Sequence, residues 1–285
     1  VGDGALAAVG TAGPIMNMAI LFISGMCMGA GILMSTLYGA KDMKNLEKQI
    51  STTLIGGLIF SMLIAFFMIV LAVPILRLIN SPEEIIGSAA IYLRVVFLGL
   101  IFTFVYNFLA NTLRALGDSK TPLYFLVISA FLNVAGDLLF VVTLRLGVMG
   151  SAIATVLSEA LCCICCGVYV KLKVPMLCLG KKWFVFERRI LWRTFSYGIT
   201  SALQQMCVQL GKILVQAIIN VQGVAFIAAF TAINRVDDFV LSPEGNIAHA
   251  TTTFIAQNRG AGDVGRVKKG YRCGIIMEII FSAAV

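Results

Sequence analysis

A single stretch, residues 121–144 (TPLYFLVISAFLNVAGDLLFVVTL), places the strongest constraint on how this chain can fold. As a helix it would extend roughly 36 Å at 1.5 Å per residue, which is enough to cross the hydrocarbon core of a bilayer. It nevertheless carries Asn133 and Asp137. An Asp at the centre of a membrane helix costs about 2.5–3.5 kcal/mol on insertion scales, so such residues usually face a bundle interior or a water-filled cavity. Ser129, Asn133 and Asp137 are spaced by four residues, which predicts one polar stripe on an otherwise apolar helix.

The rest of the chain has the composition of a polytopic membrane protein. Hydrophobic residues make up 59% of it and charged residues only 13%, and the mean hydropathy is +0.95, far from the averages of soluble domains. We therefore expect an all-α bundle of membrane helices. The chain starts without Met and stops inside an apolar run, so we expect a fragment that lacks both ends. The apolar runs cover about residues 10–38, 51–79, 85–113, 121–144, 148–170, 190–220 and 224–257, and an eighth begins near residue 271.

Basic residues gather in alternate connections between these runs. The connections near residues 41–48, 114–120, 171–193 and 259–272 hold most of the 22 Lys and Arg, whereas the intervening ones hold only Arg77 and Arg145. By the positive-inside rule the basic connections are cytoplasmic, and residue 1 lies on the outer side of a plasma membrane. The same distribution accounts for the net charge of +8 without a nucleic-acid partner.

An internal repeat appears when the start of the chain is compared with its later part at an offset of 221 residues. The offset places Gly39 on Gly260, Asp42 on Asp263 and Lys48 on Lys269 without a gap. Each copy runs from an outer connection through one apolar span into a basic connection, which gives both copies the same orientation. Parallel repeats of this kind occur in transporters whose substrate sites lie between two related halves.

Several motifs in this order resemble the MATE family of multidrug and toxic compound exporters, in particular its DinF-like branch. They are LRALGDSKTP (113–122), the pair Asn133 and Asp137, GVMGSAIAT (147–155) and FIAQNRGAGDVGRVKKG (254–270). The resemblance implies a monomer of two six-helix bundles, of which this chain holds helices 2 to 8 and the start of helix 9. Residues 1–170 would belong to the amino-terminal bundle, 171–189 to a cytoplasmic linker and 190–285 to the carboxy-terminal bundle. It further implies export of cationic amphipathic compounds in exchange for H⁺ or Na⁺, with no cofactor.

The resemblance also assigns a cation-responsive cavity to the amino-terminal bundle, lined by Asn133, Asp137, Thr155 and Tyr92. Counting from a helix hairpin that turns at residue 146 places Asp137 level with Thr155, and Asn133 level with Glu159. Other interpretations stay open. Asp137 could be paired with a base, Asn133 could hydrogen-bond between helices as packing, Glu159 could be structural, and Tyr92 could belong to the aromatic belt at the membrane surface. The family's acid on helix 1 would precede residue 1, and residues 190–220 carry no acid.

A second polar stripe follows residues 190–220. Gln205, Gln209, Lys212 and Gln216 recur at spacings of four, three and four, on one face of a helix. They could line a substrate path in the second bundle or form a seam of hydrogen bonds, and Lys212 is an unusual lining for a cationic substrate.

Three functions remain possible on the sequence alone. The first is a secondary exporter in which the drug and a proton compete for the Asp137 site. The second is a flippase for lipid-linked precursors with similar architecture. The third, a membrane enzyme, is disfavoured because the chain shows no metal-ligand spacing and no nucleophile elbow. The four cysteines between residues 162 and 166 point in different directions on a helix, which is a poor arrangement for a metal site.

Overall fold

The computed structural model describes residues 3–78, 83–174, 185–220 and 224–284, and some side chains within these ranges lie outside the description. All the elements in the described part are helices, which confirms the predicted all-α class. They are α1 (Asp3–Gly39), α2 (Met43–Leu78), α3 (Glu83–Ala115), α4 (Lys120–Asp137), the π-helix η1 (Leu138–Thr143), α5 (Gly147–Lys173), α6 (Arg188–Asn220), α7 (Val224–Gly260) and α8 (Val264–Ala284).

Five of the described helical segments are long and apolar enough to cross a membrane, namely Ala12–Gly39, Met43–Leu78, Glu83–Ala115, Lys120–Thr143 and Gly147–Lys173. Each coincides with a predicted apolar run, although α2 begins at Met43 rather than at residue 51. The extra turns of α2 carry Lys44 and Lys48, which favour helix formation and extend it beyond the apolar run. Large apolar side chains such as Phe66, Phe67 and Phe131 are exposed on the outside of the bundle, as expected for surfaces in contact with lipid.

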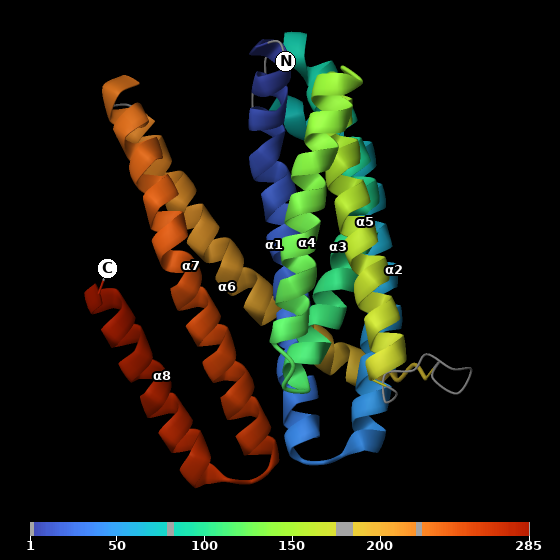
Figure 1. The fold of residues 1–285 in the computed structure, drawn as a ribbon, viewed down its shortest axis with the longest axis vertical. Coiled ribbons are helices and arrows are strands. Elements are labelled where there is room, and N and C mark those ends of the chain that lie inside the picture. Colours follow the sequence, from blue (N-terminus) through green and yellow to red (C-terminus); the bar gives the residue numbers. More distant parts are fainter. Residues whose placement is uncertain (1–2, 79–82, 175–184, 221–223, 285) are drawn as a thin grey trace.

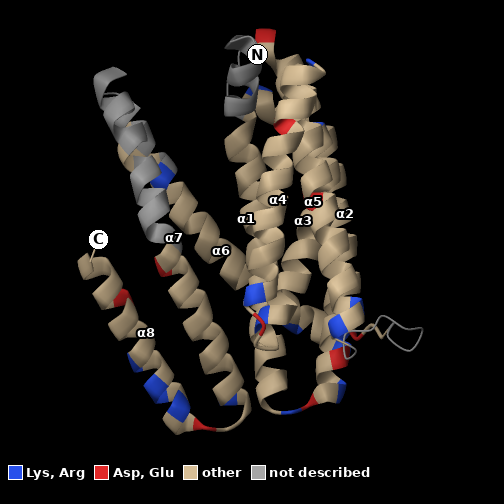
Figure 2. Ribbon diagram, viewed as in Figure 1, with Lys and Arg blue, Asp and Glu red and all other residues tan. Residues whose placement is uncertain are grey.

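Helix α1 lies at the centre of the arrangement. It packs against α3 on one side and against α6 and α7 on the other. Helices α1 to α5 stand side by side, whereas α6 and α7 diverge from them toward the end of the molecule that holds the N-terminus (Figure 1). Many of the described Lys and Arg residues lie toward the opposite end, around the turns between α1 and α2 and between α7 and α8 (Figure 2).

The predicted repeat is confirmed in the turns that follow α1 and α7. The backbone adopts a positive φ at Lys41 (57°) and at Gly262 (75°), and these two positions are 221 residues apart. The next residue in each copy, Asp42 or Asp263, accepts a hydrogen bond through Oδ1 from the backbone N–H three positions later, at 3.2 and 2.9 Å. The two copies of the sequence therefore fold into the same helix-ending turn.

The two copies also meet each other. A Cβ atom added to Gly39 would lie 1.8 Å from the carbonyl oxygen of Gln257, and one added to Gly260 would lie 1.9 Å from that of Thr36. Thr36 and Gln257 are themselves 221 residues apart. Gln257 Nε2 also donates a hydrogen bond to Ala115 O at 2.9 Å. The ends of α1 and α7 therefore cross in a reciprocal contact that only glycine permits, while the same helices diverge toward their other ends (Figure 1).

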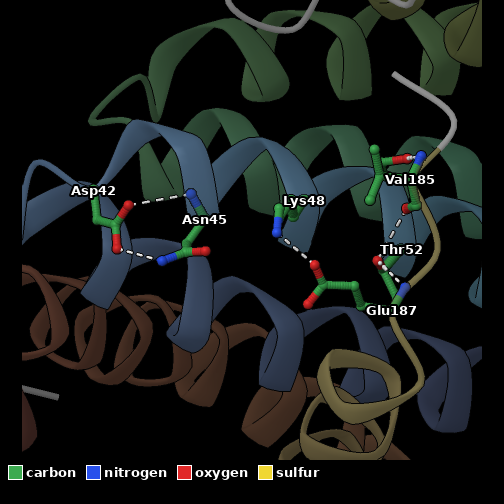
Figure 3. A network of polar contacts seen from close by, with 7 residues as sticks. Asp42, Asn45, Lys48, Thr52, Val185 and Glu187 are labelled. Atoms are coloured by element: carbon green, nitrogen blue, oxygen red, sulfur yellow. Dashed lines mark hydrogen bonds and ion pairs between the residues drawn. The ribbon is translucent and has the colours of Figure 1, made fainter. Parts of the chain in front are cut away.

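Residues 185–187, which precede α6, are bound to the start of α2 (Figure 3). The Val185 N–H donates to Ser51 Oγ at 3.1 Å, and Thr52 Oγ1 donates to Val185 O at 3.1 Å. Thr52 Oγ1 also accepts from the Glu187 N–H at 3.2 Å, and Lys48 Nζ pairs with Glu187 Oε1 at 2.5 Å. This segment, which we call the strap, falls at the end of the predicted linker 171–189, whose residues 175–184 lie outside the described part.

Candidate functional site

The polar stripe of α4 faces α5. Asn133 Nδ2 donates a hydrogen bond to Thr155 Oγ1 at 3.3 Å. One turn earlier, Ser129 Oγ donates to Ser158 O at 3.2 Å. The structure thus brings together Asn133 and Thr155, two residues predicted to line one cavity.

The vertical register of this hairpin differs from the prediction. Asn133 contacts Thr155, whereas counting from residue 146 placed it level with Glu159, about one turn further along α5. One contribution comes from η1, Leu138–Thr143, because a π-helix uses i→i+5 hydrogen bonds and rises less per residue than an α-helix. Residues 144–146, which are not helical, also depart from the assumed geometry. The count assumed α-helical geometry on both arms, so it overestimated the height of the α4 arm.

Glu159 is bound by Thr103, a residue that no sequence pattern marks as part of the site. Thr103 Oγ1 of α3 donates to Glu159 Oε2 at 2.5 Å, and its side chain is buried. A single Thr within an apolar helix usually bonds the carbonyl four residues earlier, so its sequence carries no signal for such a role. The contact adds α3 to the polar layer between α4 and α5.

Asp137 differs from its neighbours because one of its oxygens has no partner. Its Oδ1 atom is buried, and within the described residues it is the one buried side-chain polar atom that lacks a hydrogen bond. Burial of a carboxylate oxygen without a compensating partner is costly. This arrangement does not fit a structural acid that is fully satisfied by a neighbouring base.

Tyr92 of α3 lies inside the protein. Its side chain is 4% exposed, and its hydroxyl donates to Met16 Sδ of α1 at 3.6 Å. The phenol is within electrostatic range of both Asp137 and Glu159. A tyrosine of the lipid–water belt would instead project outward, so that interpretation is wrong for Tyr92.

A cleft of about 670 Å³ lies between α1, α6 and α7. Three members of the predicted second stripe, Gln205, Gln209 and Lys212, line it together with His249 of α7. The side chain of Gln216 lies outside the described residues. Asp137 and its neighbours line neither this cleft nor the other large cavity, of about 580 Å³. The two predicted groups of residues are therefore separate, with α1 between them.

The turn between α3 and α4 carries the LRALGDSKTP motif. Gly117 has a φ of 97°, which glycine adopts without strain. Asp118 Oδ1 accepts a hydrogen bond from the backbone N–H of Thr121 at 3.0 Å. Burial acts to raise the pKa of Asp118, but the hydrogen bonds from Thr121 and Lys120 outweigh it and hold that pKa below its ordinary value. The motif ends one helix and caps the next.

Metal-ligating side chains do not converge in the described part of the chain, where no group of three or more His, Cys, Asp or Glu could hold an ion. Cys162, Cys163 and Cys166 are buried, and Cys165 is exposed. Cys162 Sγ lies 3.2 Å from Phe125 O, so it serves as a packing contact between α5 and α4.

Comparison with known proteins shows which family shares this architecture. The family model MatE matches residues 1–139 and 200–285. Over its whole length the chain is 31% identical to the probable multidrug resistance protein YoeA of Bacillus subtilis, of which it covers 63%. Over 90% of its length it is 23% identical to the multidrug export protein MepA of Staphylococcus saprophyticus, of which it covers 57%. The chain thus spans less than two thirds of the length of these relatives.

Solved structures agree in fold. A crystal structure of MATE in the bent conformation aligns with 99% of this chain and 64% of its own, with a TM-score of 0.90 and 25% identity. The outward-facing conformation of a multidrug resistance MATE transporter of the MOP superfamily covers 100% of this chain and 63% of its own, with a TM-score of 0.88 and 23% identity. The family match, the full-length relative and the helical architecture together show that this chain belongs to the MatE family of membrane transporters.

Proposed function

We propose that this transporter is a secondary exporter, which moves cationic amphipathic compounds out of the cell in exchange for H⁺ or Na⁺. The basic turns would face the cytoplasm of a cell whose plasma membrane holds the protein. The proposal rests chiefly on the unpaired Oδ1 atom of Asp137. A proton or a small cation bound there would remove the cost of a buried carboxylate oxygen, and its release would restore that cost.

The neighbours of Asp137 support the role of a coupling site. Asn133 and Thr155 are linked across α4 and α5, and Thr103 links α3 to Glu159. Ion binding at Asp137 would therefore act on a layer that connects three helices. Tyr92 lies close enough to Asp137 and Glu159 to interact with their charges, and its hydroxyl contacts Met16 of α1.

The cleft between α1, α6 and α7 is the proposed substrate path. Its glutamines carry both donors and acceptors, and its wall includes apolar side chains such as Met28 and Val208, a combination that suits varied amphipathic compounds. Lys212 also lines this cleft, so a cationic substrate would bind toward the glutamines and away from the ammonium group.

Coupling would pass through α1, because this helix packs against α3 on one side and lines the cleft on the other. Exchange requires that the ion and the substrate favour different packings of the helices. The ion would favour one arrangement of α3 to α5, and the change would reach the cleft through the contact of α3 with α1.

The decisive experiment is transport by the Asp137→Asn variant at the full length of its relatives, reconstituted into liposomes. Efflux of a fluorescent cationic dye would be driven by a pH gradient and, separately, by a Na⁺ gradient. We expect the variant to lose gradient-driven efflux, and the Asp42→Asn variant, altered at an acid in the α1–α2 turn, to retain it. Undiminished efflux by Asp137→Asn would refute the proposal.

The same liposomes distinguish the exporter from a lipid flippase. A fluorescent phospholipid placed in one leaflet would report translocation in the absence of dye and gradient. An exporter leaves the lipid distribution unchanged, whereas a flippase would move the lipid and leave the dye in place.

A further inference from the structure

The second large cavity, of about 580 Å³, lies away from the cleft and from Asp137. It is formed between α1, α2, α3 and the start of α6, and its wall includes Ile23, Phe60, Phe104, Trp192 and Phe195. We propose that this cavity, named the lateral pocket here, binds one acyl chain of an anionic phospholipid whose phosphate is held by Arg188.

The inner wall of the lateral pocket offers a ligand little except apolar contact. Its hydroxyl groups already have partners within the protein. Ser61 Oγ donates to Leu58 O at 3.0 Å, and Thr194 Oγ1 donates to Ile190 O at 2.9 Å. Thr53 Oγ1 accepts from Gln49 Nε2 at 3.1 Å. A hydrocarbon chain is therefore a better match for this wall than a polar solute.

The charge at the pocket favours a negatively charged ligand. Among the described residues that line it, Arg188 is the one that carries a charge. The adjacent acid, Glu187 of the strap, does not line the pocket, and it forms an ion pair with Lys48 of α2. A guanidinium group binds phosphate strongly and disfavours the cationic compounds proposed for the cleft.

The position of the lateral pocket in the membrane favours a lipid over a free phosphate compound. Arg188 opens α6, and Trp192 follows one turn later with 73% of its surface exposed. Trp is typical of the lipid–water boundary, and basic pockets between membrane helices on the cytoplasmic side bind anionic headgroups. In the orientation proposed above, Arg188 would lie at headgroup level and the aromatic wall at acyl-chain depth.

Trp192 provides the test, because it lines the pocket. In the transporter at the full length of its relatives, with Trp192 as the only tryptophan, fluorescence would be measured in liposomes containing lipids brominated on the acyl chain. Brominated phosphatidylglycerol would be compared with brominated phosphatidylcholine at equal mole fraction. We expect the anionic lipid to quench Trp192 with about fivefold higher apparent affinity, which corresponds to about 1 kcal/mol per basic residue near a membrane surface.

Two variants assign this preference to the pocket. Arg188→Gln should abolish it, whereas Arg189→Gln, altered at an exposed neighbour that does not line the pocket, should retain it. Equal quenching by the two lipids in the unaltered protein would overturn the proposal, as would a preference that survives in Arg188→Gln. Because the readout is lipid contact and not efflux, its failure leaves the proposed export function untouched.

Discussion

The reciprocal contact between α1 and α7 makes a sharp prediction about two glycines. In Gly39→Ala the new methyl group would lie 1.8 Å from Gln257 O, and in Gly260→Ala it would lie 1.9 Å from Thr36 O. Since favourable contact between heavy atoms begins near 3.5 Å, the helices must separate by about 1.6–1.7 Å to accept either methyl group. Overpacking of this kind costs about 1–3 kcal/mol, which exceeds the roughly 0.5–1 kcal/mol that alanine gains over glycine inside a helix.

Two measurements would report the separation. Spin labels at positions 43 and 264, which are equivalent in the two repeats and begin α2 and α8, would give the distance between the two turns in the transporter at the full length of its relatives. We expect each substitution to lengthen or broaden that distance and to lower the thermal midpoint. Gly87→Ala is the matched control, because a Cβ at that helical position meets nothing within 4 Å and should be neutral or stabilising. An unchanged distance and midpoint in both Gly39→Ala and Gly260→Ala would refute the reasoning.

Three further predictions concern the turns and the strap. Asp118→Ala should cost about 1 kcal/mol of unfolding free energy, as for a lost helix cap. The pKa of Asp118 is lower in the folded protein than the ordinary Asp value near 4. The stability that Asp118 contributes is therefore fully present above about pH 4 and is lost as the pH falls through the folded-state pKa, which denaturant titrations from pH 6 to pH 3 would show. Thr52→Val should destabilise by about 1–3 kcal/mol because it leaves two strap hydrogen bonds unmade, whereas Lys48→Met should cost below about 1 kcal/mol, since both partners of its ion pair are partly exposed. Finally, both Lys41 and Gly262 have positive φ, which glycine adopts with less strain than other residues. Lys41→Gly should therefore be neutral or stabilising, whereas Gly262→Ala should cost about 1 kcal/mol of unfolding free energy, as measured by chemical denaturation.

The sequence predicted the helical spans because their apolar runs are long and are separated by charged turns. It also predicted the repeat, since the identical residues Gly39 and Gly260 lie at helix ends whose close contact leaves no room for a side chain. The register of α4 against α5 could not be predicted, because the run Leu138–Thr143, five apolar residues followed by Thr143, looks the same in an α-helix as in a π-helix.

The candidate site was predicted only in part for a similar reason. Asn133 and Asp137 stand out because polar groups are costly in an apolar helix. Thr103 does not stand out, because a hydroxyl in a membrane helix can bond its own backbone, and its contact with Glu159 depends on how α3 and α5 pack. The burial of Tyr92 likewise depends on Met16 of α1, a residue 76 positions away in the chain.

The strap limits how α6 can move relative to α2. Residues 185–187 are tied to α2, and the first turns of α6 add a further bond, in which Gln49 Nε2 donates to Thr194 Oγ1 at 2.6 Å between two buried side chains. The start of α6 is thereby anchored to the start of α2. A displacement of α6 away from α2 would therefore require this helix to bend beyond Thr194, while its first turns stay in place.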